Sequence, residues 1–117
     1  MTKYLIILND PPYGTERAYN AMRLANALQK REGVELKIFL MADAVLSAKA
    51  QQQTPNGYYN LERMLRGVTS REAVVGACGT CMDARGLTEA DLTQGVHKST
   101  LEELTDWTIE ADKVLVF

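Results

Sequence analysis

The chain begins with a short apolar run over residues 4–8 that ends abruptly at residues 9–12, Asn-Asp-Pro-Pro. An aliphatic run of this length, followed by turn-forming residues, predicts a strand that is buried in a parallel sheet. Apolar residues then recur at helical spacing over residues 18–28, and Thr15 is placed to cap that helix. A second strand is expected over Val34–Leu40. Alternation of strand and helix at these lengths favours an α/β fold.

The same alternation continues to the C-terminus, with no internal repeat and no linker. Three further strands are expected, over residues 73–77, 93–96 and 113–117. Helices or helical turns are expected between them, over residues 44–50, 82–85 and 89–92, after the capping residue Asn60, and after Ser99 or Thr100. We therefore predict that residues 1–117 form a single domain, a three-layer α/β/α sandwich around a mostly parallel sheet of about five strands.

Composition narrows the functional classes. The 117 residues include 13 Lys and Arg against 15 Asp and Glu, for a formal net charge of -2. Nucleic-acid binding depends on clustered cationic side chains, so no direct contact with nucleic acid is expected. No apolar run approaches the ~20 residues of a membrane helix, and the apolar N-terminal stretch is too short for a signal peptide. We expect a cytoplasmic protein that is not associated with a membrane.

The only two cysteines, Cys78 and Cys81, form a Cys-x-x-Cys motif directly after the third expected strand. Ligands and chemistry gather at the carboxyl ends of strands in open α/β sheets, so the sulfur of Cys78 is expected at that edge. If residues 79–85 form a helical turn, Cys78 lies at its amino-terminal end, where backbone N–H groups favour the thiolate. Arg85 adds a positive charge, and Gly79 permits a close backbone approach.

The residues alone leave four interpretations of this motif open. Cys78 can carry a persulfide sulfur taken from a donor, or Cys78 and Cys81 can act as the attacking and resolving thiols of a redox couple. The pair can also bind a metal. A closed zinc site needs four ligands, and His97 is the only histidine, so a metal would need Asp83 or a second subunit. In the fourth interpretation both thiols are small buried hydrophobic groups.

The loop over residues 9–15 follows the first strand and is expected to share the carboxyl edge of the sheet with Cys78. Asp10 and Tyr13 are therefore candidate pocket-lining residues. The loop is not a P-loop and lacks a Gly-x-Gly-x-x-Gly pattern, so it gives only a weak signal for a nucleotide or flavin site. We predict no cofactor and no bound metal.

Other conspicuous side chains have structural interpretations. His97 is expected on the surface, without the nearby carboxylates that acid–base work would need. Trp107 is expected in the core or in a subunit interface. Tyr58 and Tyr59 are equally compatible with an exposed contact surface and with packing over the sheet edge. A sparse basic strip is expected to be a solvated face: Arg63, Arg66 and Arg71.

Several motifs occur together in a combination that is more specific than any one of them. They are the first strand with its Asn-Asp-Pro-Pro-Tyr-Gly loop, residues 57–61 (Gly-Tyr-Tyr-Asn-Leu), residues 78–87 (Cys-Gly-Thr-Cys-Met-Asp-Ala-Arg-Gly-Leu), residues 95–96 (Gly-Val), Leu104-x-x-Trp107 and residues 111–117. Together they resemble the DsrE/DsrF-like family of small sulfur-relay proteins over nearly the full chain. The most specific part is a cysteine that precedes an Arg-Gly pair at the end of a central strand.

This resemblance implies an α/β/α sandwich, a homo-oligomer (trimer or hexamer) and a persulfide-carrying cysteine. The position of the family's sulfur-accepting cysteine relative to the Arg-Gly pair matches Cys78 alone. Cys81 places the chain in a subgroup with a Cys-Gly-Thr-Cys motif, most of whose members have no assigned function. The best-studied relay members do not need the second cysteine, which keeps the redox interpretation open.

The leading hypothesis is a small cytoplasmic sulfur-transfer protein in which Cys78 carries the persulfide and Cys81 modulates or resolves it. Asp10, Tyr13 and Arg85 would shape the pocket. Its partners would be sulfur donor and acceptor proteins, and the sequence leaves open whether the chain turns over a substrate as an enzyme. The alternatives are a dithiol–disulfide oxidoreductase that uses both cysteines, and an oligomeric module that holds a metal or flavin between subunits.

Overall fold

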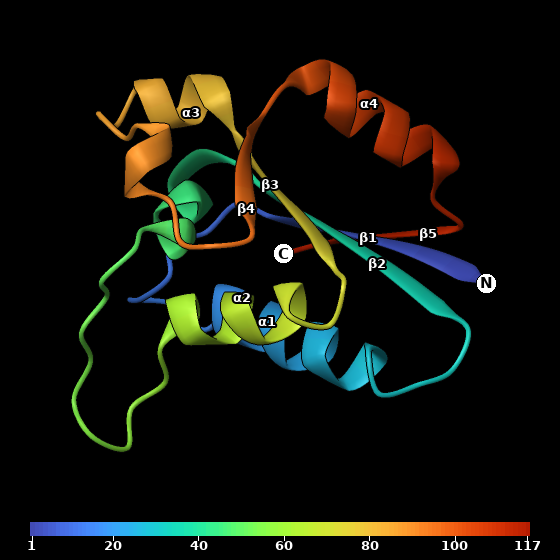
Figure 1. Ribbon diagram of the computed structural model, residues 1–117, viewed down its shortest axis with the longest axis horizontal. Coiled ribbons are helices and arrows are strands. Elements are labelled where there is room, and N and C mark those ends of the chain that lie inside the picture. The colour runs from blue at the N-terminus through green and yellow to red at the C-terminus, as the bar shows by residue number, and fades with distance from the viewer.

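A computed structural model describes residues 1–117 and contains one sheet of five strands, in the order β4-β3-β2-β1-β5, with every neighbouring pair parallel. The α/β class and the number of strands are as predicted. Figure 1 shows α1 and α2 on one face of the sheet and α4 on the other, which makes three layers. The elements in chain order are β1 (Thr2–Leu8), α1 (Arg17–Leu28), β2 (Val34–Leu40), η1 (Ala42–Ala48), α2 (Leu61–Thr69), β3 (Val74–Cys78), α3 (Gly79–Asp83), η2 (Glu89–Asp91), β4 (Val96–Ser99), α4 (Leu101–Glu110) and β5 (Lys113–Val116).

Each face of the sheet has its own hydrophobic core, because side chains alternate along a strand. In β1, Ile6 and Leu8 belong to a cluster of 20 buried residues that also includes the inner sides of α1 and α2. Leu5 faces the opposite side of the sheet and belongs to a second cluster of 4 residues on the α4 side. Trp107 lies in this smaller cluster and packs edge-on against Phe39 at a ring distance of 6.1 Å. Trp107 is therefore a core residue, one of the two roles expected for it.

The expected helix caps are confirmed at two of three positions. The side chain of Asn60 accepts a hydrogen bond from the N–H of Arg63, and that of Thr100 accepts one from the N–H of Glu103. Thr15 does not cap α1, which begins two residues later and has no side-chain cap. The Thr15 hydroxyl instead donates to a carboxylate oxygen of Asp10. No helix has both the length and the apolar character that a membrane crossing requires.

The fourth strand differs most from expectation. It covers Val96–Ser99 instead of residues 93–96. Gly95 adopts a φ of +95°, and a Cβ there would lie 2.6 Å from the hydroxyl oxygen of Thr69. The chain therefore turns tightly against the end of α2, and pairing with β3 starts only after this turn. The third strand is shifted by one residue, so that it includes Cys78.

The segment after β2 is a 3-10 helix over Ala42–Ala48, and not the helix expected over residues 44–50. It begins directly at the carboxyl end of β2, where Ala42 has a φ of +49°. This left-handed conformation is unfavourable for a residue with a Cβ. The early start brings the first turn of η1 against α3.

Candidate functional site

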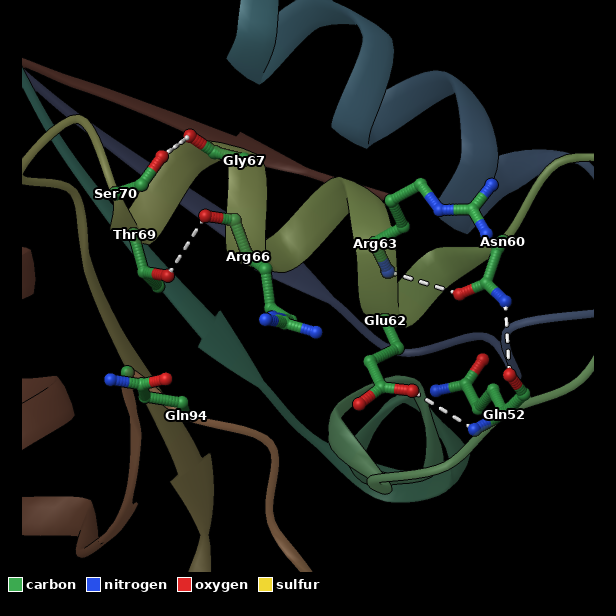
Figure 2. A pocket seen from close by; sticks show the side chains of 10 residues that line it. Gln52, Asn60, Glu62, Arg63, Arg66, Gly67, Thr69, Ser70 and Gln94 are labelled. Atoms are coloured by element: carbon green, nitrogen blue, oxygen red, sulfur yellow. Dashed lines mark hydrogen bonds between the residues drawn. The ribbon is translucent and has the colours of Figure 1, made fainter.

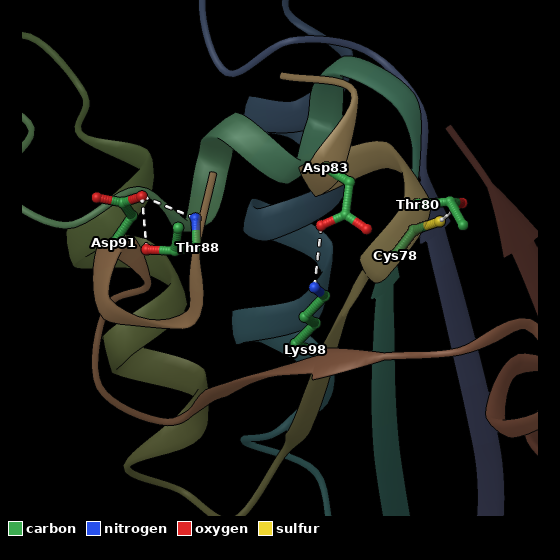
Figure 3. A network of polar contacts seen from close by, with 6 residues as sticks. All are labelled: Cys78, Thr80, Asp83, Thr88, Asp91 and Lys98. Carbon is green, nitrogen blue, oxygen red and sulfur yellow. Dashed lines mark hydrogen bonds and ion pairs between the residues drawn. The ribbon is translucent and has the colours of Figure 1, made fainter. Parts of the chain in front are cut away.

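Cys78 is positioned by two elements at once. It is the last residue of β3 and the N-cap of α3, and it pairs in register with Ser99 of β4. The residue is half-buried and contacts both hydrophobic clusters, so it lies at the carboxyl edge of the sheet between its two faces. The Sγ of Cys78 is 3.3 Å from the hydroxyl oxygen of Thr80. Figure 3 shows the two side chains facing one another.

The surroundings of Cys78 favour its thiolate. Burial raises the pKa of this thiol, but hydrogen bonds from the Thr80 hydroxyl, the Cys81 thiol and the backbone N–H groups of Cys81 and Thr80 outweigh burial and bring the pKa below the ordinary value for cysteine. These N–H groups belong to the first turn of α3. Because the thiolate is the nucleophilic form of cysteine, Cys78 has the chemistry of an attacking group.

Cys81 shows the opposite tendency. Burial, the hydrogen bond to Cys78 and the negative charge of Cys78 together raise the pKa of the Cys81 thiol. The N–H of Ala42, which donates to the Cys81 Sγ at 3.2 Å, and the charge of Arg85 lower that pKa without reversing the shift. Both cysteines are free. The pKa values of the two thiols are therefore shifted in opposite directions, Cys78 toward the thiolate and Cys81 toward the protonated thiol.

Arg85 connects α3 to the first turn of η1. Its Nε and one terminal nitrogen each lie 3.0 Å from an Asp43 carboxylate oxygen, and its other terminal nitrogen donates to the Cys81 carbonyl at 3.0 Å. Among the candidate residues, the structure thus brings Arg85 to Cys81, and no hydrogen bond or ion pair joins it to Cys78.

Lys98 is a neighbour of the site that sequence analysis did not identify. Its ammonium group lies 3.0 Å from a carboxylate oxygen of Asp83, at the end of α3 (Figure 3). A Cβ on Gly79 would lie 2.9 Å from the carbonyl oxygen of Ser99 and 3.1 Å from the Cε of Lys98. The glycine thus permits close packing of α3 on β4. This contact could not be expected from a fourth strand over residues 93–96, because Lys98 and Ser99 would then lie beyond the strand.

Asp10 and Tyr13 have their polar atoms engaged elsewhere. A carboxylate oxygen of Asp10 accepts from the Thr15 hydroxyl at 3.0 Å and lies 3.8 Å from Arg17. The Tyr13 hydroxyl donates to the Gln52 side chain at 2.5 Å and accepts from the N–H of Leu61 at 3.0 Å. No hydrogen bond joins either residue to a cysteine. Their role as lining of the sulfur site remains a prediction.

Comparison with known proteins identifies the family. The sequence model of the DsrE/DsrF-like family matches residues 2–117. The chain belongs to this family. Protein YchN of Escherichia coli K12 is 44% identical over 118 residues that span both chains completely. The crystal structure of the E. coli protein superposes with a TM-score of 0.93 at 43% identity, over 100% of both chains.

More distant members extend the comparison. A protein named sulfurtransferase TusD, from Pectobacterium carotovorum, is 30% identical over 131 residues, again across 100% of both chains. A protein of unknown function from Methanobacterium thermoautotrophicum has a TM-score of 0.80 at 13% identity over 100% of both chains, and so shows the fold alone. A sulfur-relay role is supported at the level of the family.

The surroundings of His97 differ from those expected from the sequence. Its Nε2 contacts a carboxylate oxygen of Glu103, and the Ser99 hydroxyl donates to the same oxygen at 2.6 Å. Burial raises the pKa of Glu103, but the bonds from Ser99 and His97 bring it below the ordinary value. The expectation that no carboxylate lies near His97 is therefore wrong. Because the serine bonds to the glutamate and not to the histidine, the three do not form a nucleophilic triad.

The tyrosines after the polar connector pack among themselves. The ring of Tyr59 stacks on Tyr19 at 4.2 Å and on Tyr58 at 4.5 Å, with Tyr13 at 5.6 Å. A hydrogen bond with Tyr58, together with burial, raises the pKa of Tyr59 to about 12. Tyr58 is 48% exposed at the end of this stack. Of the two roles expected for these tyrosines, Tyr59 has the packed one and Tyr58 has the exposed one.

A hollow of about 730 Å³ lies beside α2 and away from the cysteines. Figure 2 shows Arg66 pointing into it from α2, opposite Gln94, while Arg63 turns toward Asn60. No hydrophobic residue lines this hollow. No three His, Cys, Asp or Glu side chains lie close enough together to hold a metal ion. Asp83, one of the two sources of further metal ligands considered for the cysteine pair, therefore does not form such a cluster with Cys78 and Cys81.

Proposed function

We propose that this protein is a sulfur carrier in which Cys78 holds a persulfide. The Cys78 thiolate attacks the outer sulfur of a donor persulfide, the sulfur–sulfur bond of the donor breaks, and the donor leaves as a thiolate. The sulfur then resides on Cys78 until an acceptor thiolate attacks it in the same way and releases Cys78. No net oxidation occurs, so the reaction needs no cofactor.

The observation that carries this proposal is the set of donors around Cys78. A half-buried thiol at the carboxyl edge of a parallel sheet has the Thr80 hydroxyl 3.3 Å from its sulfur, and donors in Thr80 and Cys81 bring its pKa below the ordinary value for cysteine. Lowered pKa and partial exposure are the marks of a nucleophilic cysteine. The family relationship to a protein named sulfurtransferase TusD supports sulfur as the group that is transferred.

A dithiol–disulfide couple is the second candidate, because both cysteines of the Cys-x-x-Cys motif are free and each affects the pKa of the other. In that function Cys78 attacks a substrate disulfide and Cys81 resolves the mixed disulfide. The two candidates differ in what remains on the protein: a carrier retains one additional sulfur atom, whereas a redox couple retains only a bond between its own cysteines.

Intact-mass and peptide mass spectrometry after brief exposure to glutathione persulfide test the proposal. The expected product is one additional sulfur on Cys78, formed in wild-type protein and in Cys81→Ser, and absent in Cys78→Ser. Failure of Cys78 to acquire sulfur in the Cys81→Ser variant would overturn the carrier function. A parallel exposure to oxidised glutathione tests the redox couple, whose expected product is a Cys78–Cys81 disulfide with no additional sulfur.

The partners we propose are a sulfur donor protein, an acceptor protein and further copies of this chain, in the reducing cytoplasm where free thiols persist. Exposed apolar side chains on α4 and on the edge strand β5 support self-association: Leu101 is 69%, Ile109 77% and Val116 65% exposed. Light scattering coupled to gel filtration should give a trimer or hexamer. A monomer at micromolar concentration would overturn this part.

A further inference from the structure

Cys81 is held more firmly than a thiol that only fills space. Its sulfur accepts the N–H of Ala42 at 3.2 Å, a bond between residues 39 positions apart in the chain. Its carbonyl accepts from Arg85, whose guanidinium also pairs with Asp43 at 3.0 Å. Both contacts join α3 to the first turn of η1.

The backbone that supplies this N–H is strained. Ala42 has a φ of +49°, one of three residues other than glycine with positive φ. Such a conformation costs on the order of 1–3 kcal/mol and persists where surrounding contacts enforce it. The Asp43–Arg85 pair fastens the residue next to Ala42 onto α3. The strain therefore serves to direct one N–H at the Cys81 sulfur.

Loading of Cys78 changes the electrostatics of Cys81. In the unloaded protein, burial, the hydrogen bond to Cys78 and the charge of Cys78 all raise the pKa of Cys81. In a persulfide the negative charge lies on the outer sulfur, one bond farther along, and the Cys78 Sγ becomes a neutral divalent sulfur. The two contributions of Cys78 weaken, while the Ala42 N–H and the Arg85 charge, which favour the Cys81 thiolate, stay in place.

We propose that Cys81 discharges sulfur that Cys78 has not delivered, releasing it as hydrosulfide. The Cys81 thiolate attacks the Cys78 Sγ, the bond from that Sγ to the outer sulfur breaks, and the outer sulfur leaves with the bonding electron pair as HS⁻ after taking up a proton. A Cys78–Cys81 disulfide remains, so the sulfane sulfur is reduced and the two cysteines are oxidised. A cellular dithiol reductant returns the protein to its free-thiol state.

This inference rests on the proposed carrier function and adds a limit to the lifetime of the loaded state. An acceptor that docks quickly receives the sulfur, and without an acceptor the chain releases hydrosulfide. Arg85 acts in this step as a positioning residue, because its contacts are with Asp43 and Cys81 and not with the sulfur that is released.

The experiment loads the full chain with glutathione persulfide, removes the donor by rapid desalting, and follows the protein by intact mass over time. Hydrosulfide is trapped in parallel with monobromobimane. In wild-type protein the species with one additional sulfur should decay to a species two hydrogens lighter than the free-thiol protein, with one hydrosulfide released per disulfide formed. Cys81→Ser, in which a hydroxyl takes the place of the thiol, should also load and should hold its sulfur at least about tenfold longer, because the resolving thiolate is absent.

Two arginine variants test the positioning role. Arg85→Lys keeps the charge but cannot reach Asp43 and the Cys81 carbonyl together, and Arg85→Gln removes both. Discharge, expressed per loaded protein, should slow by roughly threefold in the lysine variant and tenfold in the glutamine variant, and its pH profile should shift to higher pH. Arg31→Gln is the matched control, because Arg31 is exposed and takes part in no side-chain contact that the structure records.

The outcomes separate the two proposals. If the Cys81→Ser variant acquires no sulfur, the carrier function fails and the discharge step fails with it. If wild-type protein loads but keeps its sulfur as long as Cys81→Ser does, only the discharge step is overturned. Hydrosulfide released without a Cys78–Cys81 disulfide would also overturn it. Discharge that is equally fast in Arg85→Gln and wild type would overturn the positioning role of Arg85.

Discussion

The two sulfur environments of this protein lie three residues apart in the chain but are built from different parts of the fold. The Cys78 sulfur is surrounded by donors from residues 80 and 81, within its own turn of helix. The Cys81 sulfur depends on Ala42, from the end of another strand, and on Arg85, which is anchored to Asp43. One thiol is shifted toward the thiolate and the other away from it. A Cys-x-x-Cys spacing therefore does not by itself determine the chemistry of either sulfur.

The largest expected effect concerns the division of labour between the thiols. Cys78→Ser should abolish sulfur uptake, because the carrying thiol is absent. In wild-type protein, iodoacetamide near neutral pH should alkylate Cys78 rapidly and Cys81 slowly, because burial and the hydrogen bond and charge of Cys78 raise the pKa of Cys81. Cys81→Ser should retain both sulfur uptake and rapid alkylation at Cys78. Peptide mass spectrometry after a short exposure to iodoacetamide measures the alkylation of each cysteine separately. Equal labelling of the two cysteines in wild-type protein would remove the distinction.

Close packing of α3 on β4 gives the next largest effect. Gly79→Ala places a Cβ 2.9 Å from the Ser99 carbonyl oxygen, and this backbone atom cannot move aside without disturbing the sheet. We expect the free energy of unfolding to fall by about 1–3 kcal/mol, together with slower sulfur uptake at Cys78.

Gly67→Ala is the matched control for that substitution. Gly67 lies inside α2, where a Cβ would be at an ordinary 3.6 Å from the Asn26 side chain. Alanine there should raise the free energy of unfolding by up to ~1 kcal/mol, since it favours the helix. Urea denaturation compares the two variants. If Gly79→Ala were as stable as wild type, α3 would not be held by β4 in the way described.

The local character of the Cys78 environment explains why it could be predicted from the sequence. An apolar strand running into Cys-Gly-Thr-Cys predicts a thiol at a strand end and a helix start, and the structure has both. The Cys81 environment could not be predicted, because nothing in the sequence signals a positive φ at Ala42. Lys98 and Ser99 were missed for a related reason. The turn at Gly95 depends on contact with Thr69, which a sequence pattern does not contain.

The hydroxyl of Thr80 contributes a smaller and separable part of the Cys78 environment. Thr80→Val removes a donor to the Cys78 sulfur at nearly constant shape. The pKa of Cys78 should rise, so less thiolate is present near neutral pH. Alkylation of Cys78 should slow by roughly tenfold there, since a hydrogen bond to a charged group contributes about 1.5 kcal/mol or more. At a pH well above the ordinary pKa of a thiol, both proteins are fully ionised and the difference should disappear.

Thr80→Ser retains the hydroxyl and should behave as wild type, which separates the hydrogen bond from changes in packing. A Thr80→Val protein with the wild-type pH profile would mean that the backbone N–H groups of α3 stabilise the thiolate without help from the side chain.

The smallest effect tests whether the two environments are independent. The Asp43–Arg85 pair is partly exposed, with side chains 55% and 28% accessible, so Arg85→Gln should lower the free energy of unfolding by no more than about 1 kcal/mol. Because the charge of Arg85 lowers the pKa of Cys81, its loss should raise that pKa and slow alkylation of Cys81 by about twofold to threefold in mildly alkaline solution. The rate at Cys78 should not change, because Arg85 makes no contact with that sulfur. An equal decrease at both cysteines would mean that one electrostatic field acts on the whole motif, and the separation of the two environments would no longer hold.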